Sequence, residues 1–404
     1  MMRSYRFLLR PTVGQSQALG EMLRDHCSLY NGALEDRKGS YKHRGVTVTY
    51  GQQSAQLKEI RAFDPERQGR WSFSSQQATL RRLDAAMSGF FRRMRSGEKP
   101  GYPRFKTVAR FDTVTFPRDG DGCRWDSLSG HADTRVRFQG VGHVRVNQHR
   151  PVAGVVKTIS VTREGKRWYV ILSCDRVPVR QLPTTGSVVG IDMGIANFLA
   201  DSDGGFVQNP RHDEWAAEKL ASAQRRLAAF PKVKAQKRSR RHRAAVEKVR
   251  ALHEKVRRQR LDFHHKTAVD LVRAHDVIAH EDLSIANMVR APKPKPDPEN
   301  PGGFLLNGSA AKAGLNRSIY DAGWGGFLSI MTAKAASAGR TTIPVDPRNT
   351  SRTCPECGHV SAENRPDQPT FACVACGYAS HADTVGAINV LQRAGQAPRQ
   401  AVPA

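Results

Sequence analysis

Two Cys-x-x-Cys pairs, separated by fifteen residues, restrict the fold of this chain more than any other feature of its sequence. Each pair can direct two thiolates at one metal ion, and the glycine after each second cysteine permits the tight turn that this requires. Four sulfur ligands complete the tetrahedral shell of structural zinc and leave no position open for a reacting group. We therefore expect a zinc ribbon whose ligands are Cys354, Cys357, Cys373 and Cys376.

Two apolar runs in the middle of the chain end on acidic residues. Residues 188–191 lead to Asp192, and residues 277–279 lead through His280 to Glu281 and Asp282. Such runs predict buried strands, and a buried carboxylate is costly unless a cation meets it. A hard divalent cation such as Mg²⁺ is the usual partner. An ordinary turn-capping aspartate is the alternative for Asp192, but a second strand that ends on an acid favours chemistry.

A third acid follows the second cysteine pair directly. Asp383 precedes a helical pattern whose face carries Val385, Ile388, Asn389 and Leu391. An N-cap role is common for aspartate and is the plain alternative. The position would also fix a third carboxylate beside a rigid zinc module.

The charge balance indicates an extended polyanion as the partner. The chain has 64 Lys and Arg against 37 Asp and Glu, a formal charge of +27. Neutralisation of phosphates would then supply much of the binding free energy. A non-specific binder without chemistry would have the same composition. No stretch approaches the length of a membrane span and no signal peptide is evident, so we expect a cytoplasmic protein that does not contact membranes.

Basic residues gather on several expected helices. A helix over residues 75–94 carries arginines off its apolar row, and two long helices over residues 214–274, broken near residues 230–231, have a centre dense in Lys and Arg. Solvated basic faces are the alternative. Two glutamines at the start of the first helix could read adenine edges. The predicted nucleic-acid contacts are Gln76, Gln77, Arg81, Arg82, Lys234, Lys237, Arg238, Arg240, Arg241 and Arg243.

Further elements follow from apolar spacing and from Gly and Pro. Residues 15–30 predict an amphipathic helix, and residues 96–106 a boundary. Short strands follow, including a hairpin that turns at Glu164 and Gly165, and a second hairpin turns at residues 201–205. We expect an unpacked linker at 291–303, a helix over 318–338 and a strand at 341–345.

Together these residues resemble a known family. The motifs GIDMG at Asp192, HEDL at Glu281 and the two cysteine pairs followed by ADTVGAIN resemble the split RuvC-like nuclease of TnpB proteins, which are insertion-sequence relatives of type V CRISPR effectors. The segments YRFLLRPT, YNGAL and GYPRFK resemble the N-terminal half of that family. The resemblance therefore covers nearly the whole chain.

The resemblance implies an RNase H-type core in which Asp192, Glu281 and Asp383 are the catalytic acids and hold two Mg²⁺ ions. It also implies a transposon-derived guide RNA, one protein per guide, and a double-stranded DNA target beside a short motif that the N-terminal half reads. The chain departs from the family where Asp-Arg-Asp-x-Asn-Ala is common, because it has residues 381–386 as HADTVG. The acid at 383 is kept, whereas the arginine and the first asparagine are not.

The resulting fold prediction is a multidomain α+β protein. Its predicted parts are a β-barrel-like wedge domain at 1–12 and 100–182, a helical recognition domain at 13–99, a RuvC-like nuclease domain at 183–344 and 378–395, a zinc ribbon at 345–377 and a tail at 396–404.

The predicted function is RNA-guided DNA cleavage by two-metal hydrolysis. A guide-dependent binder or repressor with little cleavage is the first alternative, although all three acids are present. An unguided resolvase-type nuclease would need neither the basic N-terminal half nor the zinc module. A DNA-strand transferase would need a tyrosine-and-histidine site, which no segment resembles.

Overall fold

The computed structural model describes residues 1–126, 128, 133–233, 238–300 and 302–396. The chain divides into two compact units, Met1–Pro178 and Val179–Ala404, which are described separately below. Within the described residues, no helix has the length and apolar character needed to cross a membrane.

The N-terminal unit contains a seven-stranded sheet in the order β2-β6-β7-β1-β5-β4-β3, and every neighbouring pair is antiparallel. Alternate residues of β1 (Tyr5, Phe7 and Leu9) are buried, as the period of a strand with one covered face requires. The predicted hairpin at Glu164 is confirmed as the β6–β7 turn. The strands are β1 Arg3–Arg10, β2 Thr113–Phe116, β3 Cys123–Arg124, β4 Arg135–Phe138, β5 Gly142–Asn147, β6 Val155–Glu164 and β7 Arg167–Asp175.

Three helices accompany this sheet: α1 Val13–Arg44, α2 Tyr50–Phe63 and α3 Phe73–Arg95. The two helices expected in this region are confirmed as α1 and α3, and both are longer than predicted. A capping box of Thr12 and Gln15 starts α1, and a left-handed Gly45 ends it. The helix α2 was not expected, although Thr49 and Gln52 form the same capping box at its start.

The second unit is built on a mixed five-stranded sheet in the order β10-β9-β8-β11-β14. The strands β8, β9 and β10 are antiparallel neighbours, whereas β11 runs parallel to both β8 and β14. The expected strands that end on acids are confirmed as β8 and β11, and the expected hairpin at 201–205 joins β9 to β10. The strands are β8 Val188–Met193, β9 Asn197–Asp201, β10 Phe206–Gln208, β11 Val277–Glu281 and β14 Thr341–Val345.

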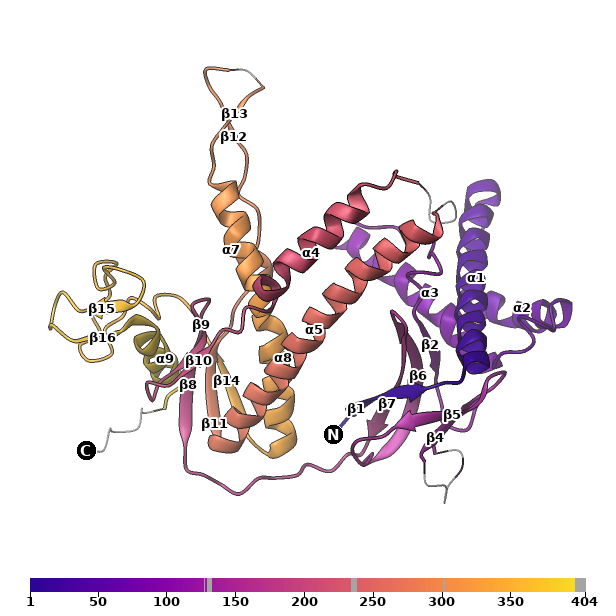
Figure 1. Ribbon diagram of the computed structural model, residues 1–404, viewed down its shortest axis with the longest axis horizontal. Helices are drawn as coiled ribbons and strands as arrows, with labels where there is room; N and C mark the ends of the chain where they lie inside the picture. Colours follow the sequence, from indigo (N-terminus) through magenta and orange to yellow (C-terminus); the bar gives the residue numbers. More distant parts are fainter. Residues whose placement is uncertain (127, 129–132, 234–237, 301, 397–404) are drawn as a thin grey trace. The chain divides into compact units, whose positions relative to one another are not determined.

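Two long helices, α4 His212–Ala228 and α5 Arg240–Ala274, form a helical hairpin in which they lie side by side (Figure 1). This confirms the two helices predicted for residues 214–274. Close to the turn, the rings of Phe230 and His242 stack with centroids 4.9 Å apart. Nearer the sheet, Arg260 of α5 forms ion pairs with Asp213 and Asp321.

The single helix predicted for residues 318–338 is two helices, α7 Ser309–Ala322 and α8 Trp324–Ala338. They meet at Gly323, whose left-handed backbone (φ 68°) ends α7. The segment 291–303 is not simply a linker, because β12 Lys295–Pro296 pairs with β13 Phe304–Leu305 in a narrow arm that leads into α7 (Figure 1). A short helix, α6 Ile285–Met288, precedes this arm.

The last elements are β15 Thr370–Ala372, β16 Ala379–His381 and α9 Ala382–Arg393. Helix α9 packs directly on β8, and this contact requires glycine at two positions. A Cβ atom on Gly190 would lie 2.1 Å from the carbonyl oxygen of Ala387, and one on Gly386 would lie 2.8 Å from Oδ2 of Asp192. The absence of side chains at both positions therefore permits this close approach.

Candidate active site

The three acids that the sequence singled out come from three different elements of the second unit. Asp192 is the fifth residue of β8, and Glu281 is the last residue of the parallel neighbour β11. Because adjacent parallel strands end at the same edge of a sheet, their carboxylates share that edge. Asp383 lies in the first turn of α9, the helix that packs on β8.

The three carboxylates line one cavity of about 550 Å³. Asp282 also lines it but is exposed. Apolar side chains form part of the wall, among them Met193, Leu283 and Trp324. The cavity is therefore acidic in one part and apolar in another.

The electrostatics of this cavity favour a cation. Burial, followed by the charges of Glu281 and Asp383, raises the pKa of Asp192 well above its usual value. Burial also raises the pKa of Glu281. Arg365 opposes the effect on Asp192 and forms a 3.4 Å ion pair with Oδ1 of Asp383. Carboxylate oxygens are the ligands that divalent cations such as Mg²⁺ take, so the donor types of these three residues suit such an ion. Among the described residues, however, only the four cysteines have ligand atoms that all lie within 4.8 Å of one another.

Two residues near the acids were missed by the sequence analysis. Arg365 contacts Asp383, and the hydroxyl of Thr350 donates a 2.7 Å hydrogen bond to Oε1 of Glu281. Both lie on the segment between β14 and β15, far from their partners along the chain. No local spacing could indicate these contacts, because they depend on how the chain folds back on the sheet.

The four cysteines of the expected zinc ribbon come together. Their sulfur atoms all lie within 4.8 Å of one another, and two of the sulfur pairs, Cys354 with Cys376 and Cys357 with Cys373, are 3.6 Å apart. Tetrahedral zinc with Zn–S bonds of about 2.3 Å needs sulfurs separated by roughly 3.8 Å. The cluster therefore has the dimensions of a closed zinc site.

The structure contradicts the prediction that Gln76 is presented to a nucleic acid. Its side chain is 0% exposed, accepts a hydrogen bond from Arg61 and donates to both oxygens of Gln68. Gln77 is half-buried and donates to Ser54. Gln76 thus fixes the loop that precedes α3.

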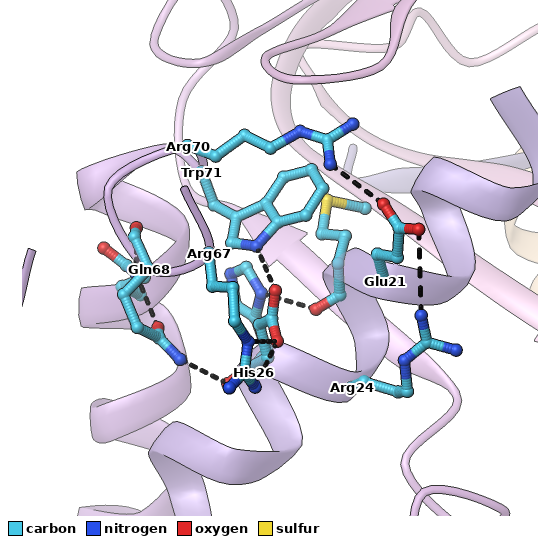
Figure 2. Close-up of polar contacts among 10 residues, drawn as sticks. Glu21, Arg24, His26, Arg67, Gln68, Arg70 and Trp71 are labelled. Atoms are coloured by element: carbon cyan, nitrogen blue, oxygen red, sulfur yellow. Dashed lines mark hydrogen bonds and ion pairs between the residues drawn. The ribbon is translucent and has the colours of Figure 1, made fainter. Parts of the chain in front are cut away.

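That loop is also attached to α1 through a buried carboxylate. Asp25 accepts hydrogen bonds from Arg67 and from the indole of Trp71, while Gln68 donates to the backbone oxygen of Asp25 (Figure 2). The start of α3 is therefore held by interior polar contacts, and an interior amide has no access to a base.

The predicted arginines remain on the surface. Arg81 and Arg82 are exposed and lie over the rings of Tyr50 and Phe111. Arg240, Arg241 and Arg243 are exposed in the first turn of α5. Arg238, just before α5, is partly buried, and Lys234 and Lys237 lie outside the described residues.

Comparison with known proteins places this geometry in context. A family described as probable transposase (OrfB_IS605) matches residues 154–291, and the Cas12f1-like TNB domain matches residues 324–390. A protein of Escherichia coli K12 named "Putative RNA-guided DNA endonuclease InsQ" is 30% identical over 393 residues, which cover 96% of this chain and 92% of the relative. A "Putative RNA-guided DNA endonuclease" of Streptomyces pristinaespiralis is 28% identical over 96% of this chain and 88% of its own length.

Among solved structures, that of the mini-RNA-guided endonuclease CRISPR-Cas_phi3 shares the fold, with a TM-score of 0.50 and 11% identity over 98% of this chain and 92% of the other. Fold and sites thus define a mixed α/β protein in which a three-carboxylate pocket adjoins a four-cysteine cluster. The chain belongs to the TnpB family.

Proposed function

We propose that the chain is an RNA-guided DNA endonuclease whose single RNase H-like site cuts phosphodiester bonds. The observation that carries this proposal is the convergence of Asp192, Glu281 and Asp383 on one cavity from β8, β11 and α9. The strand order, with three antiparallel strands followed by two parallel ones, supports the RNase H-like assignment. The names of the relatives from Escherichia coli and Streptomyces support the RNA-guided activity.

Within this proposal the three carboxylates bind the divalent cations. Bound Mg²⁺ would supply activation of a water molecule and stabilisation of the leaving 3′ oxygen, as in two-metal hydrolysis. Asp192 and Glu281 offer oxygens from the edge of the sheet, and Asp383 offers them from α9. Arg365 compensates part of the negative charge: it pairs with Asp383 and offsets part of the rise in the pKa of Asp192.

The remaining parts of the proposal concern the nucleic acids. The formal charge of +27 and the exposed arginines at the start of α5 support contacts with the phosphates of guide RNA and target DNA. We assign the reading of a short duplex motif beside the target to the N-terminal unit. The target sequence itself would be selected by base pairing with the guide RNA. The cysteine cluster would hold structural zinc, because it has no free ligand position.

The deciding experiment is cleavage of a plasmid library with Mg²⁺ by protein co-expressed with the DNA that flanks its gene. The library carries a randomised motif beside the target, and Asp192→Ala is the control. Double-strand breaks that require the guide, the motif and Asp192 are expected. Guide-dependent binding without breaks would instead make the protein a repressor. Breaks that ignore the guide would make it an unguided nuclease.

A further inference from the structure

A buried threonine is bonded to one of the three acids. The hydroxyl of Thr350 lies 2.7 Å from Oε1 of Glu281, and the two residues are 4% and 8% exposed. The same hydroxyl lies 3.0 Å from the carbonyl oxygen of Pro347. A hydroxyl can donate only one hydrogen bond at a time. When Glu281 is ionised, the Thr350 hydroxyl donates to its carboxylate, because that contact is shorter and the acceptor is charged.

This bond distinguishes the two oxygens of Glu281. Oε1 is held by Thr350, whereas Oε2 has no hydrogen-bond partner among the residues that the structure describes. Glu281 lines the acidic cavity beside Asp192 and Asp383. A carboxylate with one oxygen fixed and the other unengaged is prepared to give a single oxygen to a cation.

Thr350 is itself held by the helix that carries the third acid. The side-chain amide of Asn389 donates two hydrogen bonds of 2.7 Å, one to the backbone oxygen of Thr350 and one to that of Thr353. Asn389 is 3% exposed, and both of its donors are used. Helix α9 therefore carries Asp383 and also anchors the segment that orients Glu281 of β11.

We propose that Thr350 is a positioning residue that holds Glu281 for divalent-cation binding, and that Asn389 holds Thr350 in turn. The proposal rests on the metal-binding role given to Glu281 in the proposed function. Partners that orient metal ligands typically change metal affinity or activity by about 10- to 100-fold when they are removed. Thr350 contacts neither substrate nor metal in this proposal, so its effect passes entirely through Glu281.

The test compares Thr350→Val, which keeps the shape and removes the hydroxyl, with Thr350→Ser, which keeps the hydroxyl. Affinity for Mg²⁺ is measured by titration calorimetry on the guide-bound protein and by the Mg²⁺ concentration at half-maximal cleavage. We expect Thr350→Val to weaken Mg²⁺ binding by about 10- to 100-fold, with a smaller loss of rate at saturating Mg²⁺. Thr350→Ser should restore most of the affinity.

Thr79→Val in α3 is the matched control, because Thr79 is also buried and its hydroxyl donates to the backbone oxygen of Ser75 and not to an acid. It should leave Mg²⁺ affinity unchanged, and thermal unfolding confirms that each variant is folded. A folded Thr350→Val protein with wild-type Mg²⁺ affinity overturns the proposal. So does a Thr350→Ser protein as impaired as Thr350→Val.

A double-mutant cycle tests the role of Asn389. Asn389→Ala should weaken Mg²⁺ binding in the wild-type background and have little further effect in the Thr350→Val background, because both changes act through one contact. Purely additive effects would remove Asn389 from the proposal. Mg²⁺ binding that depends on Thr350 in a protein that cuts no DNA would support the positioning role while rejecting the nuclease function.

Discussion

Gly190 of β8 and Ala387 of α9 meet at backbone contact, since a Cβ atom on Gly190 would lie 2.1 Å from the carbonyl oxygen of Ala387. The strand carries Asp192 two residues later, and the helix carries Asp383 four residues earlier. The distance between these two acids is therefore set by a contact that tolerates no side chain.

We expect Gly190→Ala to lower the free energy of unfolding by about 1–3 kcal/mol or more, because the added methyl group meets backbone that cannot move aside. It should also reduce Mg²⁺-dependent cleavage by displacing α9. Chemical denaturation measures the first effect. The control is Gly314→Ala in α7, where a Cβ meets open space and the gain in helix propensity is about 0.5–1 kcal/mol. An unchanged denaturation midpoint for Gly190→Ala would contradict the packing described here.

Asp192→Asn should make the stability of the metal-free protein less dependent on pH. The pKa of Asp192 is raised in the folded state, so its contribution to stability is fully present below the unfolded value of about 3.9 and is lost as pH rises through the folded pKa. The neutral amide avoids that loss. We therefore expect the variant to gain stability over the wild type as pH rises towards 8.

Melting temperatures in the presence of a chelator, measured from pH 5 to 8, check this expectation. Added Mg²⁺ should raise the melting temperature of the wild type and have little effect on Asp192→Asn, because bound cations offset the charge that burial penalises. A constant difference between the two proteins at every pH would argue against a raised pKa.

Cys357→Ser should release zinc from the cysteine cluster. The free energy of zinc binding is also folding free energy for such modules, so the ribbon should lose order and take Arg365 away from Asp383. Metal analysis should show about one zinc per wild-type chain, consistent with one closed four-sulfur site, and much less in the variant. Cys174→Ala is the control, because Cys174 lies buried in the N-terminal sheet and should leave the zinc content unchanged.

Replacing Arg240, Arg241 and Arg243 by alanine should weaken nucleic-acid binding in a salt-dependent way. If each contacts one phosphate, the slope of log Kobs against log salt should fall by about 2–3 for the triple variant. The binding of guide RNA and the binding of target duplex are measured separately over a range of about 50 to 300 mM salt. Arg273→Ala, an exposed arginine near the other end of α5, is the control. Identical slopes would show that the start of α5 is merely solvated.

Gln76 and Gln77 should respond differently to alanine. Gln76→Ala removes one acceptor of the Arg61 guanidinium and the Nε2 donor to Oε1 of buried Gln68, and should cost about 1–3 kcal/mol of stability. Gln77→Ala loses one half-buried bond to Ser54 and should cost about 1 kcal/mol. The plasmid library with the randomised motif then compares Gln77→Ala with the wild type. A change in the preferred motif would show that Gln77 reads a base.

Residue patterns predicted those parts of the fold that depend on neighbours along the chain. The apolar runs before Asp192 and Glu281 became β8 and β11, and the Pro231 break separated α4 from α5. Apolar spacing did not predict the end of α7, because Gly323 interrupts a continuous apolar pattern with a left-handed turn.

The contacts within the site could be predicted only in part. Each acid became a candidate through its position at the end of a strand or the start of a helix, which is local information, whereas the choice of Glu281 over Asp282 came from the family resemblance. The bonds of Thr350 to Glu281 and of Asn389 to Thr350 join residues 69 and 39 positions apart. The burial of Gln76 likewise depends on a loop that returns to α1, so its amide could not be distinguished from an exposed one.

The positions of the acids along the chain set the time at which the site can exist during synthesis. Asp192 and Glu281 leave the ribosome first, and Asp383 follows roughly a hundred residues later, which takes about 5–20 s at ordinary elongation rates. Until α9 emerges, β8 lacks the helix that packs on it at Gly190, and the third acid is missing. If the site works as proposed, a chain interrupted before Asp383 therefore lacks one of the three acids and cannot assemble this site.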